Sequence, residues 1–335
     1  MKASAITPLY TVYIVSETKK YNVSAAISSV DRSEAKKELA QSVTLQIANV
    51  KVGGSQLSDL ISACDRIYIY ANDGTTRDEV FRGYVWGGGK QSALEERSMT
   101  IKGYDHLIYM QESEASEFFA SGMATEDIVG KVCQDWGVKL EYTYDSITHP
   151  KLALRGSLSD ILTSDILDPV KKQTGKDYTI ISDKDVMKVK RVGDNKTIYR
   201  ILEKSNAISA SAEFTMNGVV TKVVILGTAD SEDREPVEAV ESGNTKKYGT
   251  LQKIIRRDEN TTLDDAKKEA RYIIKTDGDP KWSYLLKAPD IPWIRKGDMM
   301  YVNAGDIKNK YLIVDDIDRV SDTTKNEMTL TLSMP

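Results

Sequence analysis

The sequence predicts a mixed, mainly β fold in which two related β-modules flank a smaller α+β insert. Apolar and polar residues alternate in several segments, as in 65–70, where Ile67 and Ile69 alternate with Tyr68 and Tyr70. This period of two is typical of strands with one buried face. The segment from Asp65 to Asp105 recurs in weaker form from Asp298 to the C-terminus, and helical spacing replaces the alternation between them.

The repeat preserves the order of strand, turn, strand, loop and strand. Its matched pairs are Asp65 with Asp298, Tyr68 with Tyr301, Ala71 with Ala304, Gly74 with Gly305, Phe81 with Tyr311, and Met99 with Met328. The distance from aromatic residue to methionine is one residue longer in the first copy. An internal repeat of this length indicates two similar β-modules in one chain.

Length and composition describe a globular protein of two or three domains. The chain has 335 residues, 40% hydrophobic and 29% charged, with a formal net charge of −4. The mild acidity gives no sign of a nucleic-acid-binding surface, which shows as a basic excess. No apolar run is long enough for a transmembrane helix. The N-terminus lacks the apolar core of a signal peptide, so we expect synthesis in the cytoplasm without conventional secretion and no membrane insertion.

Cysteine and histidine are scarce. Cys64 and Cys133 are the only cysteines, and His106 and His149 are the only histidines. Two isolated thiols fit a reducing compartment, and a lone buried cysteine is more often packing than chemistry. Zinc sites and histidine-dependent triads are therefore not expected, and the sequence offers no catalytic, cofactor-binding or metal-binding residues.

The first module spans residues 1–105. Strands are predicted over 10–15 and 42–48, and the charged segment 31–41 between them is either a solvated loop or short helix, or a protruding contact loop. Asn72-Asp73-Gly74 favours a hairpin turn, because these residues adopt positive φ cheaply. Gly87-Gly88-Gly89 lacks the spacing of a phosphate-binding loop, so we expect a flexible hairpin loop.

The α+β insert spans residues 106–205. Thr125 is predicted to cap a helix with an apolar stripe from Ile128 to Trp136, and Gly137 ends it. A second helix begins near Ser157 or Ser159, and Pro169 must break it or start a new turn. A β-hairpin then turns over 183–185.

The second module spans residues 206–335. Residues 219–226 are rich in branched side chains and predict a central strand. Residues 228–247 are acidic and poor in apolar residues, which favours a mobile loop over an acidic docking arm. Thr262 and Asp265 have capping-box spacing before a helix over 262–276, which we expect to pack on the second module.

Candidate chemistry is sparse. Asp315, Asp316 and Asp318 form the densest carboxylate cluster, but a strand turns Asp315 away from the other two and leaves too few oxygens for calcium. Glycosidase chemistry needs only two carboxylates, and nothing in the sequence singles out a pair. No nucleophile elbow motif occurs.

The order of several short motifs resembles one family. Val80-Phe81-Arg82-Gly83-Tyr84-Val85, Gly103-Tyr104-Asp105-His106-Leu107 and Cys133-Gln134-Asp135-Trp136-Gly137 are followed by Leu158-Ser159-Asp160-Ile161-Leu162, Tyr248-Gly249-Thr250-Leu251-Gln252 and Arg295-Lys296-Gly297-Asp298. This order is similar to the baseplate hub proteins of contractile phage tails, and most of all to the hubs of PBSX-like defective prophages and phage-tail-like bacteriocins.

The resemblance implies that the two β-modules are tube-type β-barrels and that three chains form a ring of pseudo-sixfold symmetry. Such a homotrimer would join the hexameric tail tube to the trimeric central spike, contact baseplate wedge proteins and let DNA pass without specific binding. It would be assembled into a virion or tail-like particle, a contractile injection system. The family implies no catalytic residues and no cofactors.

Two other functions remain open from the sequence. One is a tail-associated peptidoglycan hydrolase, since hubs can carry lytic modules. The other is a carbohydrate-binding or receptor-binding β-protein, although Trp86, Trp136, Trp282 and Trp293 are scattered as core residues would be.

Overall fold

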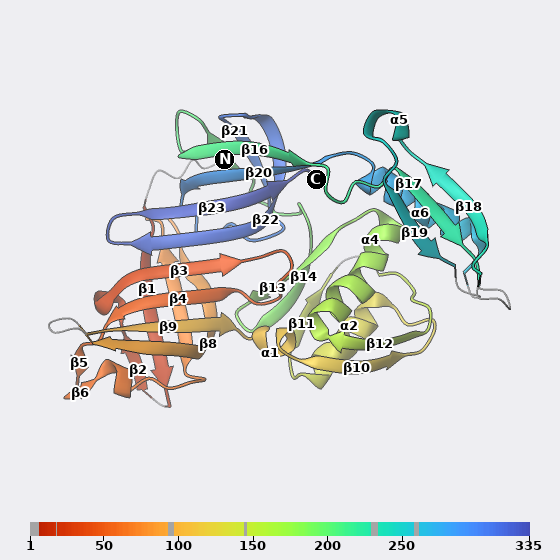
Figure 1. Cartoon of the computed structure of the whole chain (residues 1–335). Helices are drawn as coiled ribbons and strands as arrows, with labels where there is room; N and C mark the ends of the chain where they lie inside the picture. The colour runs from red at the N-terminus through yellow and green to blue at the C-terminus, as the bar shows by residue number, and fades with distance from the viewer. Residues whose placement is uncertain (1–6, 18, 93–96, 144–145, 229–233, 258–260) are drawn as a thin grey trace. The chain divides into compact units, whose positions relative to one another are not determined.

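The computed structural model describes residues 7–17, 19–92, 97–143, 146–228, 234–257 and 261–335, and the chain forms two compact units. Unit 1 comprises Met1–Ser211 and Tyr284–Pro335, and unit 2 comprises Ala212–Ser283. Unit 1 contains the first β-module, the α+β insert and most of the second β-module (Figure 1).

The first module is an antiparallel sheet whose inward side chains share one core. Its strands, in the order β3-β4-β9-β8-β7-β1-β2, are β3 (Ile27–Glu34), β4 (Ser42–Ala48), β9 (Arg97–Asp105), β8 (Arg77–Ser92), β7 (Arg66–Asn72), β1 (Leu9–Ser16) and β2 (Lys19–Asn22). Short elements complete it: η1 (Ser24–Ala26), β5 (Lys51–Val52), β6 (Ser55–Gln56) and η2 (Leu57–Asp59). Val12 of β1 and Val30 of β3 lie in the same core although their strands are far apart in the pairing order, so the sheet curls over itself.

The second module repeats five of these strands in the same order. Its strands, in the order β16-β20-β23-β22-β21-β15, are β16 (Ser209–Thr215), β20 (Lys281–Pro289), β23 (Asn326–Ser333), β22 (Ile307–Asp322), β21 (Met299–Ala304) and β15 (Tyr199–Leu202). The last strand, β15, pairs parallel with β21 whereas β1 pairs antiparallel with β7, and β2 has no counterpart among the described strands. β16 and β20 cross the boundary of unit 1, and the other four strands lie within it. In both modules a three-stranded meander, β7-β8-β9 or β21-β22-β23, has a 16-residue middle strand.

The hydrogen-bond register fixes which residues of the two modules are equivalent. Val85 N donates to Asp65 O at 2.7 Å, and Val314 N donates to Asp298 O at 2.9 Å. The pairing of β8 with β9 shifts just after Val85, and that of β22 with β23 just after Val314. The internal repeat expected from the sequence is therefore a repeat of strand order and of register.

One matched pair from the sequence is wrong by one residue. Register places Tyr311 opposite Tyr301 and Arg82 opposite Tyr68, so Tyr311 is the equivalent of Arg82 and not of Phe81. Phe81 is buried in its core, whereas Tyr311 is exposed. With Arg82 as the partner, the distances to Met99 and Met328 become equal.

The turn prediction is confirmed and the glycine-loop prediction is wrong. Asp73 Oδ1 accepts bonds from the N–H groups of Thr75 and Thr76, at 2.9 and 2.6 Å, between β7 and β8. Gly87–Gly89 lie inside strand β8 and pair with β9. A Cβ at Gly88 would lie 2.4 Å from Thr100 O, so the close approach of β9 requires glycine there.

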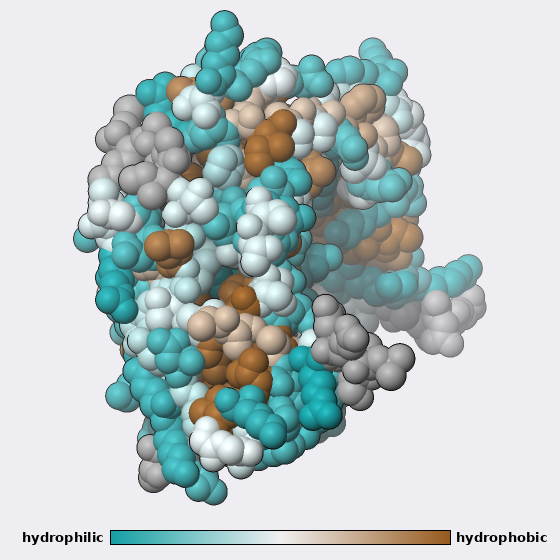
Figure 2. Space-filling model, turned by 90° about the vertical axis from the view of Figure 1, so that its left-hand side faces the viewer, coloured by the Kyte–Doolittle hydropathy of each residue, from teal (hydrophilic) through white to brown (hydrophobic). Residues whose placement is uncertain are grey.

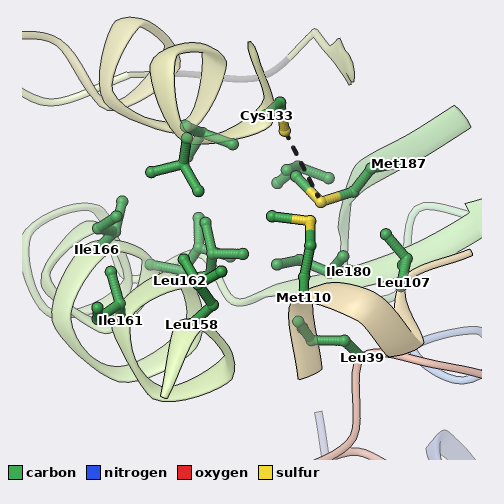
Figure 3. Packing of buried hydrophobic residues seen from close by; sticks show 14 of the residues in the cluster. Leu39, Leu107, Met110, Cys133, Leu158, Ile161, Leu162, Ile166, Ile180 and Met187 are labelled. Carbon is green, nitrogen blue, oxygen red and sulfur yellow. Dashed lines mark hydrogen bonds between the residues drawn. The ribbon is translucent and has the colours of Figure 1, made fainter. Parts of the chain in front are cut away.

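The insert has its own core. Its elements are α1 (Ile108–Gln111), β10 (Glu114–Phe119), α2 (Thr125–Asp135), β11 (Lys139–Tyr142), β12 (Leu152–Ser157), α3 (Leu158–Asp160), the π-helical η3 (Ile161–Leu167), α4 (Asp168–Thr174), β13 (Tyr178–Asp183) and β14 (Val186–Arg191). Side chains of α2 and η3 meet those of α1 and β14 between the helices (Figure 3). Leu39, from the loop after β3, lies in the same core and ties the insert to the first module.

Helix starts in the insert differ in part from the prediction. Ser157 Oγ accepts from Asp160 N at 3.1 Å, and Pro169 begins α4, both as expected. Thr125 is not a cap, because the N-cap is Ala124 and the Thr125 hydroxyl instead contacts Ile147 O and His149 Nε2.

Unit 2 is a three-stranded sheet covered on one face by a helix. The order is β18 (Val237–Ser242), β17 (Lys222–Leu226) and β19 (Gln252–Arg256), with helices α5 (Thr245–Tyr248) and α6 (Leu263–Asp277). Val223 and Ile225 pack against Ala266, Ala270 and Ile273 of α6. The central strand is confirmed, and Thr262 caps α6 by accepting from Asp265 N at 3.1 Å.

Two expectations about this region change. Residues 237–242 form a strand rather than a loop, because their N–H and C=O groups pair with β17; residues 229–233 lie outside the described residues. The sequence predicts that helix α6 packs on the second module. The helix instead buries its apolar face on the sheet of unit 2.

Surface polarity is mixed. On the face shown in Figure 2, hydrophilic residues dominate and hydrophobic residues gather in small groups. No helix within the described residues is long and apolar enough to cross a membrane.

Candidate functional site

The two β-modules are joined edge to edge, so their strands form one continuous sheet. The second half of β22 pairs antiparallel with β3, from Ile317 opposite Glu34 to Asp322 opposite Ser29. In Figure 1 the strands from β16 through β22 to β3 and β8 follow one another. We call this contact the module junction. Several charged side chains are buried in it, among them Arg32, Glu34, Asp290 and Arg319.

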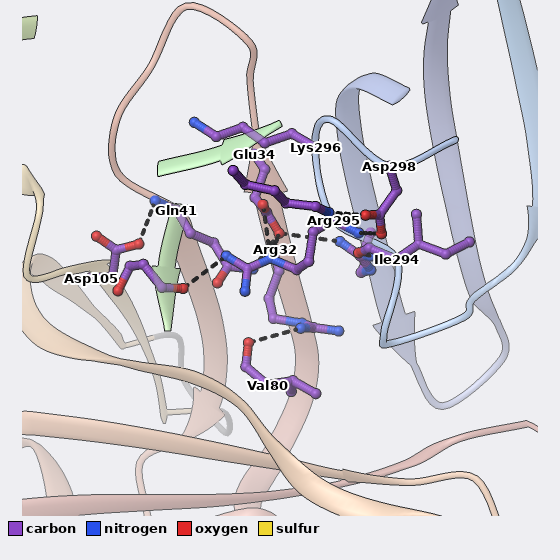
Figure 4. A network of polar contacts seen from close by, with 12 residues as sticks. Arg32, Glu34, Gln41, Val80, Asp105, Ile294, Arg295, Lys296 and Asp298 are labelled. Atoms are coloured by element: carbon purple, nitrogen blue, oxygen red, sulfur yellow. Dashed lines mark hydrogen bonds and ion pairs between the residues drawn. The ribbon is translucent and has the colours of Figure 1, made fainter. Parts of the chain in front are cut away.

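Four charged side chains meet inside the module junction. Arg319 Nε lies 3.0 Å from Asp290 Oδ1, and each side chain is only 1% exposed. Glu34 Oε1 lies 2.8 Å from Arg295 Nε and 3.9 Å from Arg319 Nη1. Figure 4 shows Glu34 and Arg295 pointing toward each other from opposite modules. Buried charges are tolerated only when they are paired and hydrogen-bonded, as these are.

Further hydrogen bonds complete this network. Arg319 Nη2 donates to the carbonyl of Ile294, and Tyr10 donates its hydroxyl to Asp290. Arg32 Nη2 lies 2.8 Å from the Tyr10 hydroxyl and 3.8 Å from Asp290 Oδ2. The guanidinium groups thus reach carboxylates across the module junction, which fixes its register.

Burial and charge shift several pKa values at the module junction. Burial alone would raise the pKa of Glu34, but Arg295 and Arg319 outweigh it and hold the pKa below the ordinary value. Burial raises the pKa of Asp105 to about 7, although its carboxylate accepts from Gln41 N and Leu107 N at 2.9 Å each. Burial lowers the pKa of Lys296, whose ammonium donates to backbone carbonyls of the loop after β3.

The aspartates that the sequence offered as a metal cluster bind protein groups instead. Asp318 Oδ1 accepts from Ser33 Oγ at 2.7 Å, and Asp316 Oδ1 accepts from Lys36 N at 2.9 Å. Asp315 Oδ1 lies 2.8 Å from Lys36 Nζ. They hold β3 and its following loop against β22. The described part of the chain contains no group of three side chains suited to hold a metal ion.

The insert contacts both modules through charged groups. Arg295 Nη2 donates to Ser182 O at 3.0 Å, and Lys190 pairs with Asp298 of the second module. Asp185 pairs with Arg66 and Arg82 of the first module, at 2.5 and 3.3 Å. These bonds fix the insert against both modules within unit 1.

Cys133 and both histidines are buried. Burial raises the pKa of the Cys133 thiol to about 12, and its Sγ packs 4.0 Å from Met187 Sδ. His106 Nδ1 and Ser182 Oγ are 2.9 Å apart, and His149 Nε2 contacts Thr125 Oγ1 at the same distance. Burial lowers the pKa of both imidazoles.

With this architecture established, comparison with known proteins is informative. A family model described as YQBQ-like matches residues 30–333, which include most of the first β-module, the insert, unit 2 and the second β-module. The chain belongs to the YQBQ-like family.

Solved structures with the same fold include three tail proteins. The 43 kDa tail protein of prophage MuSo2 from Shewanella oneidensis has a TM-score of 0.72 at 15% identity and covers 97% of this chain and 98% of its own. A tail protein from Neisseria meningitidis gives 0.69 at 13% identity, covering 97% and 96%. A prophage tail protein from Listeria monocytogenes gives 0.62 at 13% identity, covering 96% and 94%. At these identities the likeness concerns the fold. No curated protein matches the chain.

Sequence reasoning about this YQBQ-like chain missed the buried charges of the module junction. A signal was present, because Arg32 and Glu34 occupy the apolar phase of a strand after Val30, and Arg319 occupies it after Ile317. Charged residues in the buried phase of a strand indicate either a strand edge facing water or a partner of opposite charge. Here the partner is the other module.

Proposed function

We propose that this protein is a structural subunit of a phage-type tail baseplate, and that it acts as the hub. Three chains form a ring of six β-modules that joins the hexameric tail tube on one side to a trimeric central spike on the other. Baseplate wedge proteins contact the ring from outside, and DNA passes through it without specific binding. The protein works by shape and not by catalysis.

One observation carries the proposal: the chain contains two modules that share the order of five strands, fixed side by side by the module junction. A pair of like modules lets a threefold assembly imitate six similar subunits. Three solved structures that share the fold are tail proteins by their titles, two of them from prophages, which supports the same setting for this chain.

The charge balance supports a passive conduit. A wall that neutralised phosphates would bind DNA strongly, whereas a net charge of −4 favours sliding over binding. The particle is either a DNA-packaging phage tail or a headless tail-like bacteriocin, and in both the protein is made in the bacterial cytoplasm before assembly.

The oligomeric mass of the purified chain tests the proposal. We expect light scattering to give three times the chain mass of 37.3 kDa at high protein concentration, and electron microscopy to show rings with six lobes. A monomer at all concentrations, or a ring of another order, contradicts the proposal. A zymogram on bacterial cell walls should show no clearing; lysis would favour the peptidoglycan hydrolase instead.

A further inference from the structure

Each module contains both kinds of strand that form the module junction: a long middle strand and an outer strand. Within one chain, the junction takes the long strand of the second module and the outer strand of the first. The junction joins the second half of a long middle strand, β22, to an outer strand, β3. By register, Met99 opposite Lys90 corresponds to Met328 opposite Arg319, so 87–92 of β8 correspond to 316–321 of β22. The equivalent of β3 is β16, the outer strand beside β20.

Among the described strands, the second half of β8 is paired along only one of its two edges. From Gly87 to Ser92 its backbone pairs with β9, while β7 pairs only with 77–84. Every residue from Trp86 to Gln91 is exposed. A hollow of about 230 Å³ lies beside it, lined in part by Ile61, Val85 and Met99. A long strand edge next to apolar side chains is a site where another strand adds.

The outer edge of β16 is likewise unpaired among the described strands, because β16 ends the order of the sheet. Ile208 N donates to Lys287 O at 2.8 Å, so the chain leading into β16 runs beside β20. In the first module β3 runs beside β4 in the same way. Lys287 corresponds to Gln46 of β4, and Gln46 lies opposite Ser29 of β3. Ile208 therefore corresponds to Ser29, so Ala210 corresponds to Asp31 and Ser211 to Arg32. Ser209, Ala210 and Ser211 are small and permit close approach.

A salt bridge marks the same relationship. Lys90 Nζ lies 2.8 Å from Asp59 Oδ1, with side chains 60% and 57% exposed. By register Lys90 corresponds to Arg319, whose pair with Asp290 lies beside the adjoining β3 with each side chain 1% exposed. Lys90 is therefore the uncovered counterpart of a buried cation.

We propose that the free edge of β8 in one copy pairs antiparallel with β16 of the next copy, repeating the module junction between chains. This rests on the ring proposed above and assigns its contact. In the module junction Val320 lies opposite Asp31, and Arg319 lies opposite Arg32. At the equivalent positions between copies, Gln91 lies opposite Ala210 of the neighbouring copy, and Lys90 lies opposite its Ser211. Each chain has one edge of each kind, so the contact is head-to-tail, the kind that forms a ring when the rotation between copies closes.

Cysteine cross-linking tests this register. In a Cys64→Gly background, the double variant Gln91→Cys/Ala210→Cys should form disulfide-linked dimers and trimers on mild oxidation, and reductant should return them to single chains. The matched control is Asp31→Cys/Val320→Cys at the equivalent positions of the module junction, which should give only a linkage within one chain. Either cysteine of the first pair alone should give no trimer.

The outcomes separate the two proposals. A trimer by light scattering that does not cross-link through the Gln91/Ala210 pair overturns the edge contact and leaves the ring intact. A chain that neither trimerises nor cross-links overturns both. A Lys90→Glu variant gives a second readout, because it places like charges at Asp59: we expect at least a tenfold weaker self-association with unchanged monomer unfolding, and unaltered association contradicts the proposed contact.

Discussion

Cys64 and Gly297 occupy the same position in the two β-modules, and both have left-handed backbone, with φ of 68° and 79°. Cys64 N donates to Val85 O at 2.8 Å, and Gly297 N donates to Val314 O at 2.7 Å. The turn before each meander thus needs a positive φ, which glycine adopts without steric cost and cysteine does not.

We predict that Cys64→Gly stabilises the protein by about 0.5–1 kcal/mol, because relief of the backbone strain exceeds the added entropy of the unfolded chain. Gly297→Ala should cost about 2 kcal/mol or more, since its Cβ would lie 2.5 Å from Thr179 Cγ2. Urea unfolding measures both. Adding Thr179→Ala to Gly297→Ala should recover the steric part alone; no recovery would show that φ accounts for the whole cost.

Breaking the charge network of the module junction should destabilise the folded protein. Arg319→Met leaves Asp290 and Glu34 buried beside a neutral side chain, so we expect a loss of about 3–5 kcal/mol in the free energy of unfolding. The control is Lys36→Met, which removes a pair with Asp315 in which the lysine is 54% exposed, and should cost less than about 1 kcal/mol. Equal effects of the two changes would contradict a structural role for the buried pair.

The raised pKa of Asp105 predicts a pH dependence of stability. Because the folded pKa is about 7 and the unfolded value is near 3.9, the folded state holds the proton more tightly between these values. The free energy of unfolding should therefore fall as pH rises from about 4 to 7, by at most about 1.4 kcal/mol per pH unit from this group, and then level off.

The variant Asp105→Asn isolates that contribution. It cannot accept both backbone N–H bonds, so it lowers stability by an offset, but it should remove the slope. His106 and His149 have lowered pKa values and contribute slopes of the opposite sign that both proteins share. The difference between the two pH profiles is the measurement, and a constant difference from pH 4 to 8 would refute the assignment.

The two thiols should differ in reactivity. Cys64 is exposed, whereas Cys133 is buried with its pKa raised to about 12, so it holds almost no thiolate at neutral pH. A thiol reagent should modify one cysteine per native chain, and Cys64→Gly should abolish this fast reaction. Modification of Cys133 at a comparable rate would show that the insert core opens readily.

Much of the fold follows from local sequence signals. The alternation of Ile67 and Ile69, the turn at Asp73 and the cap at Thr262 each act within a few residues, so the sequence identifies them. The repeat of Asp65 at Asp298 also matches in hydrogen bonding, because the two carbonyls accept from Val85 N and Val314 N.

Long-range pairing was harder to predict. Three consecutive glycines are typical of a loop when the local sequence is considered alone. Gly87–Gly89 form part of a strand because they pair with β9. Val237–Ser242 is acidic on its surface, but β17 supplies its hydrogen-bond partners. The module junction depends on Glu34 meeting Arg295, residues separated by most of the sequence; the buried phase of Glu34 indicates that a partner exists, but no local pattern identifies Arg295 as that partner.

Unit 2 enters the chain between β16 and β20, which are neighbours in the sheet of the second module. In topological terms the two strands are the arms of a hairpin, and a whole folded domain takes the place of its loop. Such a domain can be exchanged, enlarged or deleted in favour of a short turn without changing the strand order that surrounds it. Related chains are thus free to diversify this domain while the strand order of the second module stays constant.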